Sequence, residues 1–404
     1  MGNLQTGLGN RQTGLGNWQT GYCTNVHAGA DLQATRANLQ QHALSVRDQF
    51  AGSEAMGVGL WLSAAAANSL VDDQGIDEFR QWLETERLVP FTMNGFPYGD
   101  FHQPVVKHLV YQPTWYEQTR LDYTNTLVDI LDQILPAGIE GSISTLPVCW
   151  GNPGPSEDQR REAARLLRAA ADHMARTESE RGRLIYLCIE PEPGCFMDRG
   201  EDIVRFFEQD VLPGGNEEII RRHLRVCHDV CHAAVMFEEQ TDVLQLFRDR
   251  GLKVGKVQVS SAIKLRLDGK THDERQAALN QLREFAEDRY LHQTVWRTAA
   301  DDLRFFEDLP AALAELEANP AIAGEVRVHF HVPIFVENFG HLGTSQQEVI
   351  DCIQATSSDE ELTHYEVETY AWGVLPEELR QENLAAGIAK ELEWFRDLAE
   401  KVDR

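Results

Sequence analysis

The stretch from Val226 to His232 concentrates side chains that could bind a metal ion or move protons. It holds two thiols, two imidazoles and one carboxylate, which are common transition-metal ligands and common enzymatic acids and bases. Asp229 and His232 are three residues apart, so one helical turn would bring both side chains to one ion. Cys227 and Cys231 have no second pair with zinc-site spacing, and we expect both to be small buried apolar residues.

Similar side chains follow other apolar runs. Glu190 comes after Leu-Cys-Ile and before a proline, and a carboxylate beside buried residues needs a cation, either a metal or a structural ion-pair partner. His329 and His331 are two residues apart, so in a strand both point to one face. Glu366 and Glu368 have the same spacing, and one of them could be an ordinary ion-pair partner.

The other candidates are polar or aromatic residues at strand ends and in loops. The segment from Asn94 to His102 is rich in glycine, proline and aromatic residues, which indicates either a rigid turn or a loop that covers a substrate. Lys107, His102 and Arg120 could hold an anionic group of that substrate. The residues that we expect to line a substrate pocket are His27, Asn94, His102, Lys107, Glu192, His232, Gln258, His329 and Trp372.

From Tyr22 onward, short apolar runs that indicate strands alternate with longer amphipathic runs that indicate helices, and these elements would position the candidate residues. Amphipathic helix patterns cover 157–177, with Ser156 as a cap, and also 217–223, 301–317 and 379–402. This alternation predicts parallel β/α architecture, and the absence of a GxGxxG turn favours a (β/α)8 TIM barrel over a doubly wound sheet. One strand is in excess, which indicates an inserted strand or hairpin within 254–370. The predicted strands are 22–26, 58–62, 89–93, 141–146, 184–189, the run around Val226, 254–259, 326–330 and 365–370.

The N-terminal segment differs from the rest of the chain. Residues 2–22 are three copies of one heptad, GNLQTGL, GNRQTGL and GNWQTGY, and their glycines and few apolar residues leave no coiled-coil seam. We predict a disordered tail over residues 1–21 and one barrel domain over residues 22–404.

Composition narrows the function classes. The formal net charge of −27 makes nucleic acid or an anionic membrane surface an unfavourable partner. We find no apolar run long enough to span a bilayer, no signal peptide pattern and no disulfide framework among the seven cysteines, and therefore expect a cytoplasmic protein without direct membrane insertion.

Three of these motifs resemble the xylose isomerase-like TIM-barrel superfamily. They are Glu190 in Ile-Glu-Pro-Glu-Pro, the Asp-x-x-His of Asp229 and His232, and Glu368 in Val-Glu-Thr-Tyr. In the epimerase branch, a Glu, an Asp, a His and a Glu after strands five to eight hold one divalent metal, and the two glutamates move the substrate proton. Gln258 stands where the strand-seven histidine is expected, unless His331 supplies that ligand from the extra strand.

A closer resemblance covers nearly all of residues 22–394. It is carried by eight strings in the same order, and these are similar to the EboE-type family of metabolite traffic proteins, encoded in the Ebo gene cluster of cyanobacteria and other bacteria. The resemblance implies a role in moving a precursor metabolite, in cyanobacteria the scytonemin monomer, towards the periplasm, with other proteins of the cluster as possible partners. The strings are residues 21–27, 94–102, 141–147, 190–193, 256–262, 290–293, 328–333 and 366–372.

These observations combine into one expected site. We expect one divalent ion (Zn, Mn, Co or Fe) held by Glu190, Asp229, His331 and Glu368, and a small-molecule metabolite as the ligand. In an enzyme, Glu190 and Glu368 would act as base and acid in proton transfer next to a carbonyl of a sugar or sugar phosphate. The alternative is a carrier that binds the metabolite without chemistry. Phosphodiester cleavage, as in the endonuclease branch, is disfavoured by the charge.

Overall fold

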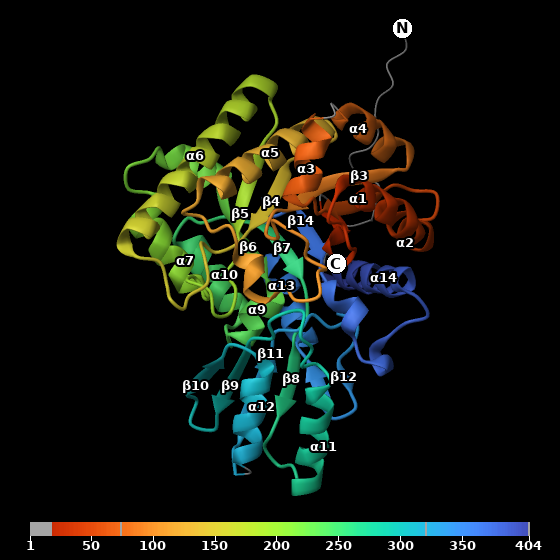
Figure 1. The fold of residues 1–404 in the computed structure, drawn as a ribbon, viewed down its shortest axis with the longest axis vertical. Coiled ribbons are helices and arrows are strands. Elements are labelled where there is room, and N and C mark those ends of the chain that lie inside the picture. The colour runs from red at the N-terminus through yellow and green to blue at the C-terminus, as the bar shows by residue number, and fades with distance from the viewer. Residues whose placement is uncertain (1–17, 73–74, 320, 403–404) are drawn as a thin grey trace.

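The computed structural model describes residues 18–72, 75–319 and 321–402, and its centre is a closed barrel of eight parallel strands (Figure 1). The strands follow one another around the barrel in the order β1-β14-β7-β6-β5-β4-β3-β2, so the predicted TIM-barrel fold is confirmed. Their bounds are β1 Gln19–Cys23, β2 Met56–Leu60, β3 Leu88–Asn94, β4 Gly141–Thr145, β5 Ile185–Ile189, β6 Leu224–Asp229, β7 Val254–Val259 and β14 His364–Val367.

Helices cover the outside of the barrel (Figure 1). The long helix α6 begins at the predicted cap, where Ser156 and Gln159 form a capping box, which satisfies two backbone donors at the helix start. The helices that belong to the barrel are α1 Leu32–Asn38, α2 Leu44–Phe50, α3 Ala64–Asp72, α4 Ile76–Thr85, α5 Gln118–Ile134, α6 Glu157–Arg181, α7 Gly200–Phe206, α8 Glu217–His223, α9 Val230–Val235, α10 Gln240–Asp249, α13 Gln346–Thr356 and α14 Leu384–Val402.

The inserted strand or hairpin expected within 254–370 is a larger unit, a second sheet of six strands between β7 and β14, in the order β10-β9-β11-β8-β13-β12. All neighbouring pairs in it are antiparallel, and Figure 1 shows this unit projecting from one end of the barrel. It contains the predicted extra strand as β11. Its elements are β8 Ile263–Arg266, α11 His272–Arg283, β9 Thr294–Thr298, β10 Leu303–Phe306, α12 Leu309–Ala318, β11 Gly324–Val328, β12 Asn338–Phe339 and β13 Leu342–Thr344.

Three predicted segments differ from the structure. The helix expected over 379–402 begins at Leu384. The expected helix over 301–317 is a strand, β10, followed by α12, because Leu303–Phe306 pairs with β9 and Asp308 caps a helix that has a proline in its first turn. The barrel begins at Gln19, three residues before the expected strand at Tyr22, and Trp18 stacks on Tyr365 with ring centroids 4.2 Å apart. Residues 1–17 of the predicted tail lie outside the described residues.

A buried ion pair occupies the interior of the barrel. Lys256 on β7 and Glu366 on β14 are both fully buried, and the Lys256 Nζ lies 2.7 Å from Glu366 Oε2. Gly59 makes this possible, because a Cβ at that position would lie 1.3 Å from Glu366 Oε1. A buried pair of this kind is costly to break from one side, since the remaining charge has no water.

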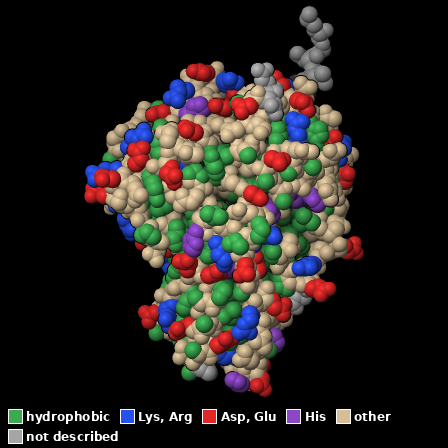
Figure 2. Space-filling model, in the orientation of Figure 1, with side chains coloured by type: hydrophobic (Ala, Val, Ile, Leu, Met, Phe, Trp, Pro, Cys, Tyr) green, Lys and Arg blue, Asp and Glu red, His purple; other side chains and the backbone are tan. Residues whose placement is uncertain are grey.

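The surface has no single electrostatic character on the face shown in Figure 2, where acidic and basic side chains are interspersed. Within the described ranges no helix is both long and apolar enough to cross a bilayer.

All seven cysteines are buried and free, and Cys227 and Cys231 are fully buried as expected.

Candidate metal and substrate site

Asp229 is placed by two neighbouring elements at the carboxyl end of the barrel. It is the last residue of β6 and the N-cap of α9, and its Oδ1 accepts the His232 N–H at 2.9 Å and the Ser260 hydroxyl at 2.7 Å. Its Oδ2 is buried and has no hydrogen-bond partner in the described chain. One oxygen therefore holds the helix start, and the other is left for a ligand.

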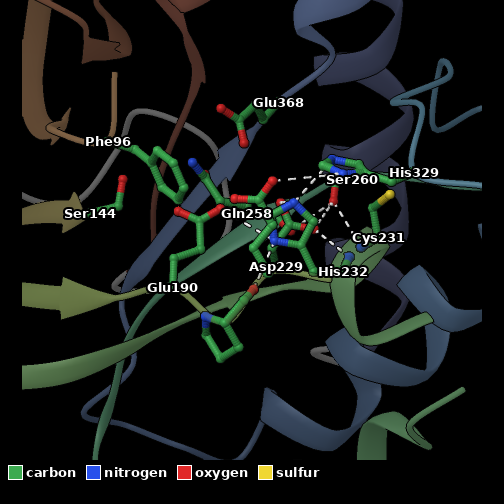
Figure 3. Close-up of polar contacts among 12 residues, drawn as sticks. Phe96, Ser144, Glu190, Asp229, Cys231, His232, Gln258, Ser260, His329 and Glu368 are labelled. Carbon is green, nitrogen blue, oxygen red and sulfur yellow. Dashed lines mark hydrogen bonds and ion pairs between the residues drawn. The ribbon is translucent and has the colours of Figure 1, made fainter. Parts of the chain in front are cut away.

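Glu190 and Glu368 approach Asp229 from other strands (Figure 3). Glu190 directly follows β5 and Glu368 directly follows β14, and one carboxylate oxygen from each of these three residues lies within 4.8 Å of the other two. Two amides hold Glu368 Oε1, Asn25 Nδ2 at 2.6 Å and Asn94 Nδ2 at 3.0 Å. Glu190 Oε2 is buried without a hydrogen-bond partner among the residues described.

His331 reaches this group from the inserted unit. Its Nδ1 lies 2.7 Å from the Glu368 carbonyl oxygen, and because a carbonyl can only accept, Nδ1 must carry the hydrogen. The Nε2 therefore presents a lone pair, which lies 3.8 Å from Asp229 Oδ2 and has no hydrogen-bond partner in the described ranges. Fixing the tautomer through Nδ1 in this way is typical of metal-ligating histidines.

Two more imidazoles, those of His232 and His329, lie beside His331, and a hydrogen bond at Nδ1 also fixes the tautomer of each. His232 Nδ1 donates to the Pro191 carbonyl at 2.9 Å, and His329 Nδ1 donates to Gln293 Oε1 at 2.7 Å. The Gln293 amide nitrogen donates to Glu192 and Tyr111, which fixes the orientation of the amide. The two Nε2 atoms face each other at 3.2 Å, and only a proton or a cation between them makes that approach favourable.

The electrostatics of the site follow from burial and crowding of like charges. Burial, reinforced by Glu368 and Asp229, raises the pKa of Glu190 well above its usual range. Burial, with Asp229 and Glu366, raises the pKa of Glu368 to about 8, and burial lowers the pKa of His331 to about 4. Burial also opposes the charge on Asp229, but neighbouring histidines and hydrogen-bond donors outweigh it and lower its pKa.

The donor set fits a divalent ion. Buried oxygens of Glu190 and Asp229 and a buried imidazole nitrogen of His331 all lack partners in the part of the chain that the structure describes. Their carboxylate and imidazole chemistry suits zinc, manganese, cobalt or iron. Besides the Glu190, Asp229 and Glu368 group, the atoms of Asp229, His232 and His331 also lie within 4.8 Å of one another.

A cavity opens above these residues, and a concave pocket of this kind is where a small molecule could bind. Of the residues predicted to bind substrate, Asn94, Lys107, Glu192, His232 and His329 line it, together with Glu190, Glu368 and His331. Gln258 is fully buried, and both of its amide atoms lack partners within the described residues.

Besides Gln258, three predicted substrate residues do not line this cavity. His27 stacks on His42 and bonds the Tyr22 hydroxyl at 3.0 Å, and it lines a separate small cavity. His102 anchors the loop after β3 by its contact with the Asn25 carbonyl at 2.6 Å. Trp372 donates its indole N–H to Glu391 at 3.1 Å and packs against α14. Arg120 bonds backbone carbonyls of Gly95, Phe96 and Pro113 and is fully buried, so it holds this loop and does not face a ligand.

Sequence reasoning did not select several residues of the site. Asn25 and Gln293 orient acidic side chains, and aromatic residues such as Tyr111 and Tyr370 line the cavity. Asn25 lies near the end of the predicted strand 22–26, which was an available signal. Gln293 and Tyr290 lie in one of the strings that carry the family resemblance, residues 290–293, but neither was selected as a site residue, and only the fold of the inserted unit brings them to the site.

Comparisons with known proteins give fold-level likeness only. No protein-family model matches the chain, and no curated protein matches it. Among solved structures, the chain is similar to the probable 3-DHS dehydratase AsbF of Bacillus anthracis, with 12% identity, TM-score 0.45 and coverage of 94% of this chain and 98% of that chain.

Two further structures show the same level of likeness. A xylose isomerase-like TIM-barrel protein from Mycobacterium smegmatis in complex with magnesium has 12% identity and TM-score 0.46, over 96% of this chain and 98% of that chain. The IOLI protein with a bound zinc atom has 9% identity and TM-score 0.47, over 95% and 98%. The strand pairing establishes the barrel, and the conclusions below rest on the geometry of the site.

Proposed function

We propose that the protein is a metal-dependent isomerase or epimerase that moves a proton at a carbon atom next to a carbonyl group. The observation that carries this proposal is the buried cluster of Glu190, Asp229 and Glu368, in which Asp229 Oδ2 lies 3.8 Å from the lone pair of His331 Nε2. Three buried carboxylates packed together are unfavourable unless a proton or a cation offsets their charge.

One divalent ion held by Glu190, Asp229, His331 and Glu368 would polarise the carbonyl oxygen of the substrate. Glu190 and Glu368 then have the chemistry of a proton donor and acceptor. Burial raises the pKa of both carboxyls in the absence of an ion, that of Glu368 to about 8, and a bound divalent cation would lower both pKa values and favour ionised carboxylates that can accept a proton. One carboxylate takes the proton from carbon, and the other returns a proton to the opposite face or to the neighbouring carbon.

The remaining residues orient the reacting groups. Asn25 and Asn94 donate to Glu368 Oε1, which directs its other oxygen away from the amides. Glu192 is held by Tyr111 and Gln293 and lines the cavity without joining the Glu190 cluster. The acidic cavity floor favours a small-molecule metabolite over a phosphate backbone.

Solvent deuterium incorporation tests this proposal. Metal-loaded protein should incorporate deuterium next to the carbonyl of a substrate drawn from a panel of ketoses and other α-hydroxy ketones, and Glu190→Gln should abolish it. Glu238→Gln is the matched control, since it makes the same change on a carboxylate that accepts the Gly200 N–H outside the cavity and should retain exchange. Equal exchange by wild type and Glu190→Gln would rule out Glu190 as the proton-transfer group.

A second proposal is a carrier role, which the resemblance to EboE-type metabolite traffic proteins implies. Gln258 supports it, because a neutral amide stands at the strand-seven position of the expected imidazole ligand, and an amide is a weaker ligand for transition metals. A carrier would bind its metabolite without deuterium exchange, and Glu190→Gln would change only the affinity. A cytoplasmic location and partners from the same gene cluster are further parts of this proposal.

A further inference from the structure

The wall of the cavity is aromatic, in contrast to its acidic floor. Five aromatic side chains line it, and all are at most 8% exposed. They come from two segments after β3, from the inserted unit and from the turn after β14. Aromatic surface of this extent offers stacking and edge-to-face contacts to a ring. The five residues, here called the aromatic collar, are Phe96, Phe101, Tyr111, Tyr290 and Tyr370.

The aromatic collar has an ordered geometry. Phe101, Tyr290 and Tyr370 contact one another with centroid separations between 5.0 and 5.5 Å, and Phe96 meets Tyr111 edge to face at 6.1 Å. The collar begins directly beside the candidate metal ligands, because the Tyr370 and His331 rings are 4.7 Å apart. A ligand bound through its oxygens at the floor would therefore extend between aromatic faces.

The cavity offers no free cation for an anionic ligand among the described residues that line it. Lys107 is the only lysine or arginine among them, and its Nζ lies 2.5 Å from Asp308 Oδ2. The floor itself carries Glu190, Glu192 and Glu368. A phosphate or carboxylate group on the ligand would be repelled from this cavity, since no unpaired positive side chain offsets its charge.

We infer that the ligand of this site is an uncharged compound with an aromatic ring next to the oxygen-bearing carbons that contact the metal ligands. The inference rests on the proposed metal site and goes beyond the sugar or sugar phosphate expected from sequence. The oxygens lie over Glu190, Glu368 and His331, and the ring lies within the aromatic collar.

Paired metal-chelating probes test this inference directly. Acetohydroxamate and benzohydroxamate carry the same chelating group and differ in the replacement of a methyl by a phenyl group. Calorimetric titration of the metal-loaded full chain should show benzohydroxamate binding at least about tenfold more tightly, because the phenyl ring is buried against the collar. Cyclohexanecarbohydroxamate, with a saturated ring, should bind more weakly than benzohydroxamate, and phosphonoacetohydroxamate should gain nothing over acetohydroxamate.

The outcomes separate this inference from the proposed function. If neither acetohydroxamate nor benzohydroxamate binds, the metal site fails, and the ring inference fails with it. If both bind with equal affinity, the metal site stands and the ring inference is overturned. If cyclohexanecarbohydroxamate binds as tightly as benzohydroxamate, the inference that the ring of the ligand is aromatic is overturned. If phosphonoacetohydroxamate binds more tightly than acetohydroxamate, the requirement for an uncharged ligand is overturned.

A collar variant provides the residue-level test. Phe101→Leu keeps an apolar side chain in the loop and removes the aromatic face, so the preference for benzohydroxamate should fall about threefold or more. The affinity for acetohydroxamate should not change, which also reports that the variant is folded and retains its metal. An unchanged preference in Phe101→Leu and in Tyr290→Leu would overturn the placement of the ring in the collar.

Discussion

Replacing Asp229 with asparagine should separate the two roles of this side chain. Oδ1 accepts the His232 N–H at 2.9 Å and the Ser260 hydroxyl at 2.7 Å, and an amide oxygen can accept both. Oδ2, 3.8 Å from the lone pair of His331 Nε2, becomes an NH₂ group. That group can donate to His331 in the metal-free protein, but it cannot bind a cation.

The expected change in stability caused by Asp229→Asn has opposite signs in the metal-free and the metal-bound protein. Without metal, Asp229→Asn gains one hydrogen bond, about 0.5–1.5 kcal/mol, and removes a buried charge. With an ion at about one hundred times its dissociation constant, the wild type gains about 2.7 kcal/mol of stability, and the variant gains nothing. For about 380 folded residues the unfolding entropy is about 0.8 kcal/mol/K, so the wild-type shift in Tm is about 3 °C.

Thermal unfolding followed by circular dichroism measures both effects. Each protein is stripped with a chelator, dialysed and unfolded with and without added Zn²⁺ or Mn²⁺. The control is Asp172→Asn, which makes the same change at an exposed position on α6 and should respond to metal as the wild type does.

Two results would refute this reasoning. A metal-induced shift in Asp229→Asn equal to that of the wild type would show that Asp229 is not a ligand. A wild type whose Tm responds to no divalent ion would remove the metal centre altogether, and the clustered carboxylates would then be a hydrogen-bonding pocket.

Three further predictions concern buried charges around the site. Lys256→Met should lower the free energy of unfolding by about 3–5 kcal/mol, because it leaves Glu366 unpaired, and the double variant Lys256→Met/Glu366→Gln should recover most of this loss. Denaturant unfolding measures both values, and a Lys256→Met protein as stable as the wild type would contradict this prediction. Burial raises the pKa of Glu391 to about 7, so its contribution to stability is present below about pH 4.5 and is lost as pH rises through about 7. Relative to Glu391→Gln, the wild type should lose about 2–3 kcal/mol of unfolding free energy between about pH 5 and about pH 8.5. A difference in unfolding free energy that does not change with pH would exclude this titration. Arg120→Lys should cost about 2 kcal/mol of unfolding free energy, because a lysine cannot bond all three carbonyls. Thermal unfolding measures this loss, and a loss below about 0.5 kcal/mol would mean that the guanidinium group is not needed.

The barrel strands could be predicted from sequence because each is a short, largely buried run, and most end at or directly before a polar residue. The expected strand at 254–259 agrees with β7 residue for residue, and those at 141–146 and 184–189 agree with β4 and β5 to within one residue. The helix expected over 301–317 was wrong over its first residues and correct from Leu309 onward, because the first residues have no local signal that distinguishes a strand from a helix. Pairing with β9, a tertiary contact, decides it.

The candidate site was partly predictable for the same reason. Parallel strands bring their carboxyl ends together, so Glu190, Asp229 and Glu368 were expected to meet once the barrel was inferred, and the structure brings them within 4.8 Å. The sequence could not choose between Gln258 and His331, because the strand before His331 has the same apolar pattern as a barrel strand.

By itself, the sequence determined the barrel, the excess strand and the acids at the strand ends, because periodicity and strand-end chemistry are local properties. Only the tertiary structure decided which histidines reach the acids, because His331 and His329 arrive through an inserted antiparallel sheet whose pairing is non-local. It also decided that Arg120 and Lys107 are occupied by partners and that aromatic residues from three distant segments form one wall. Burial and partnership depend on what packs against a residue, and no local pattern records that.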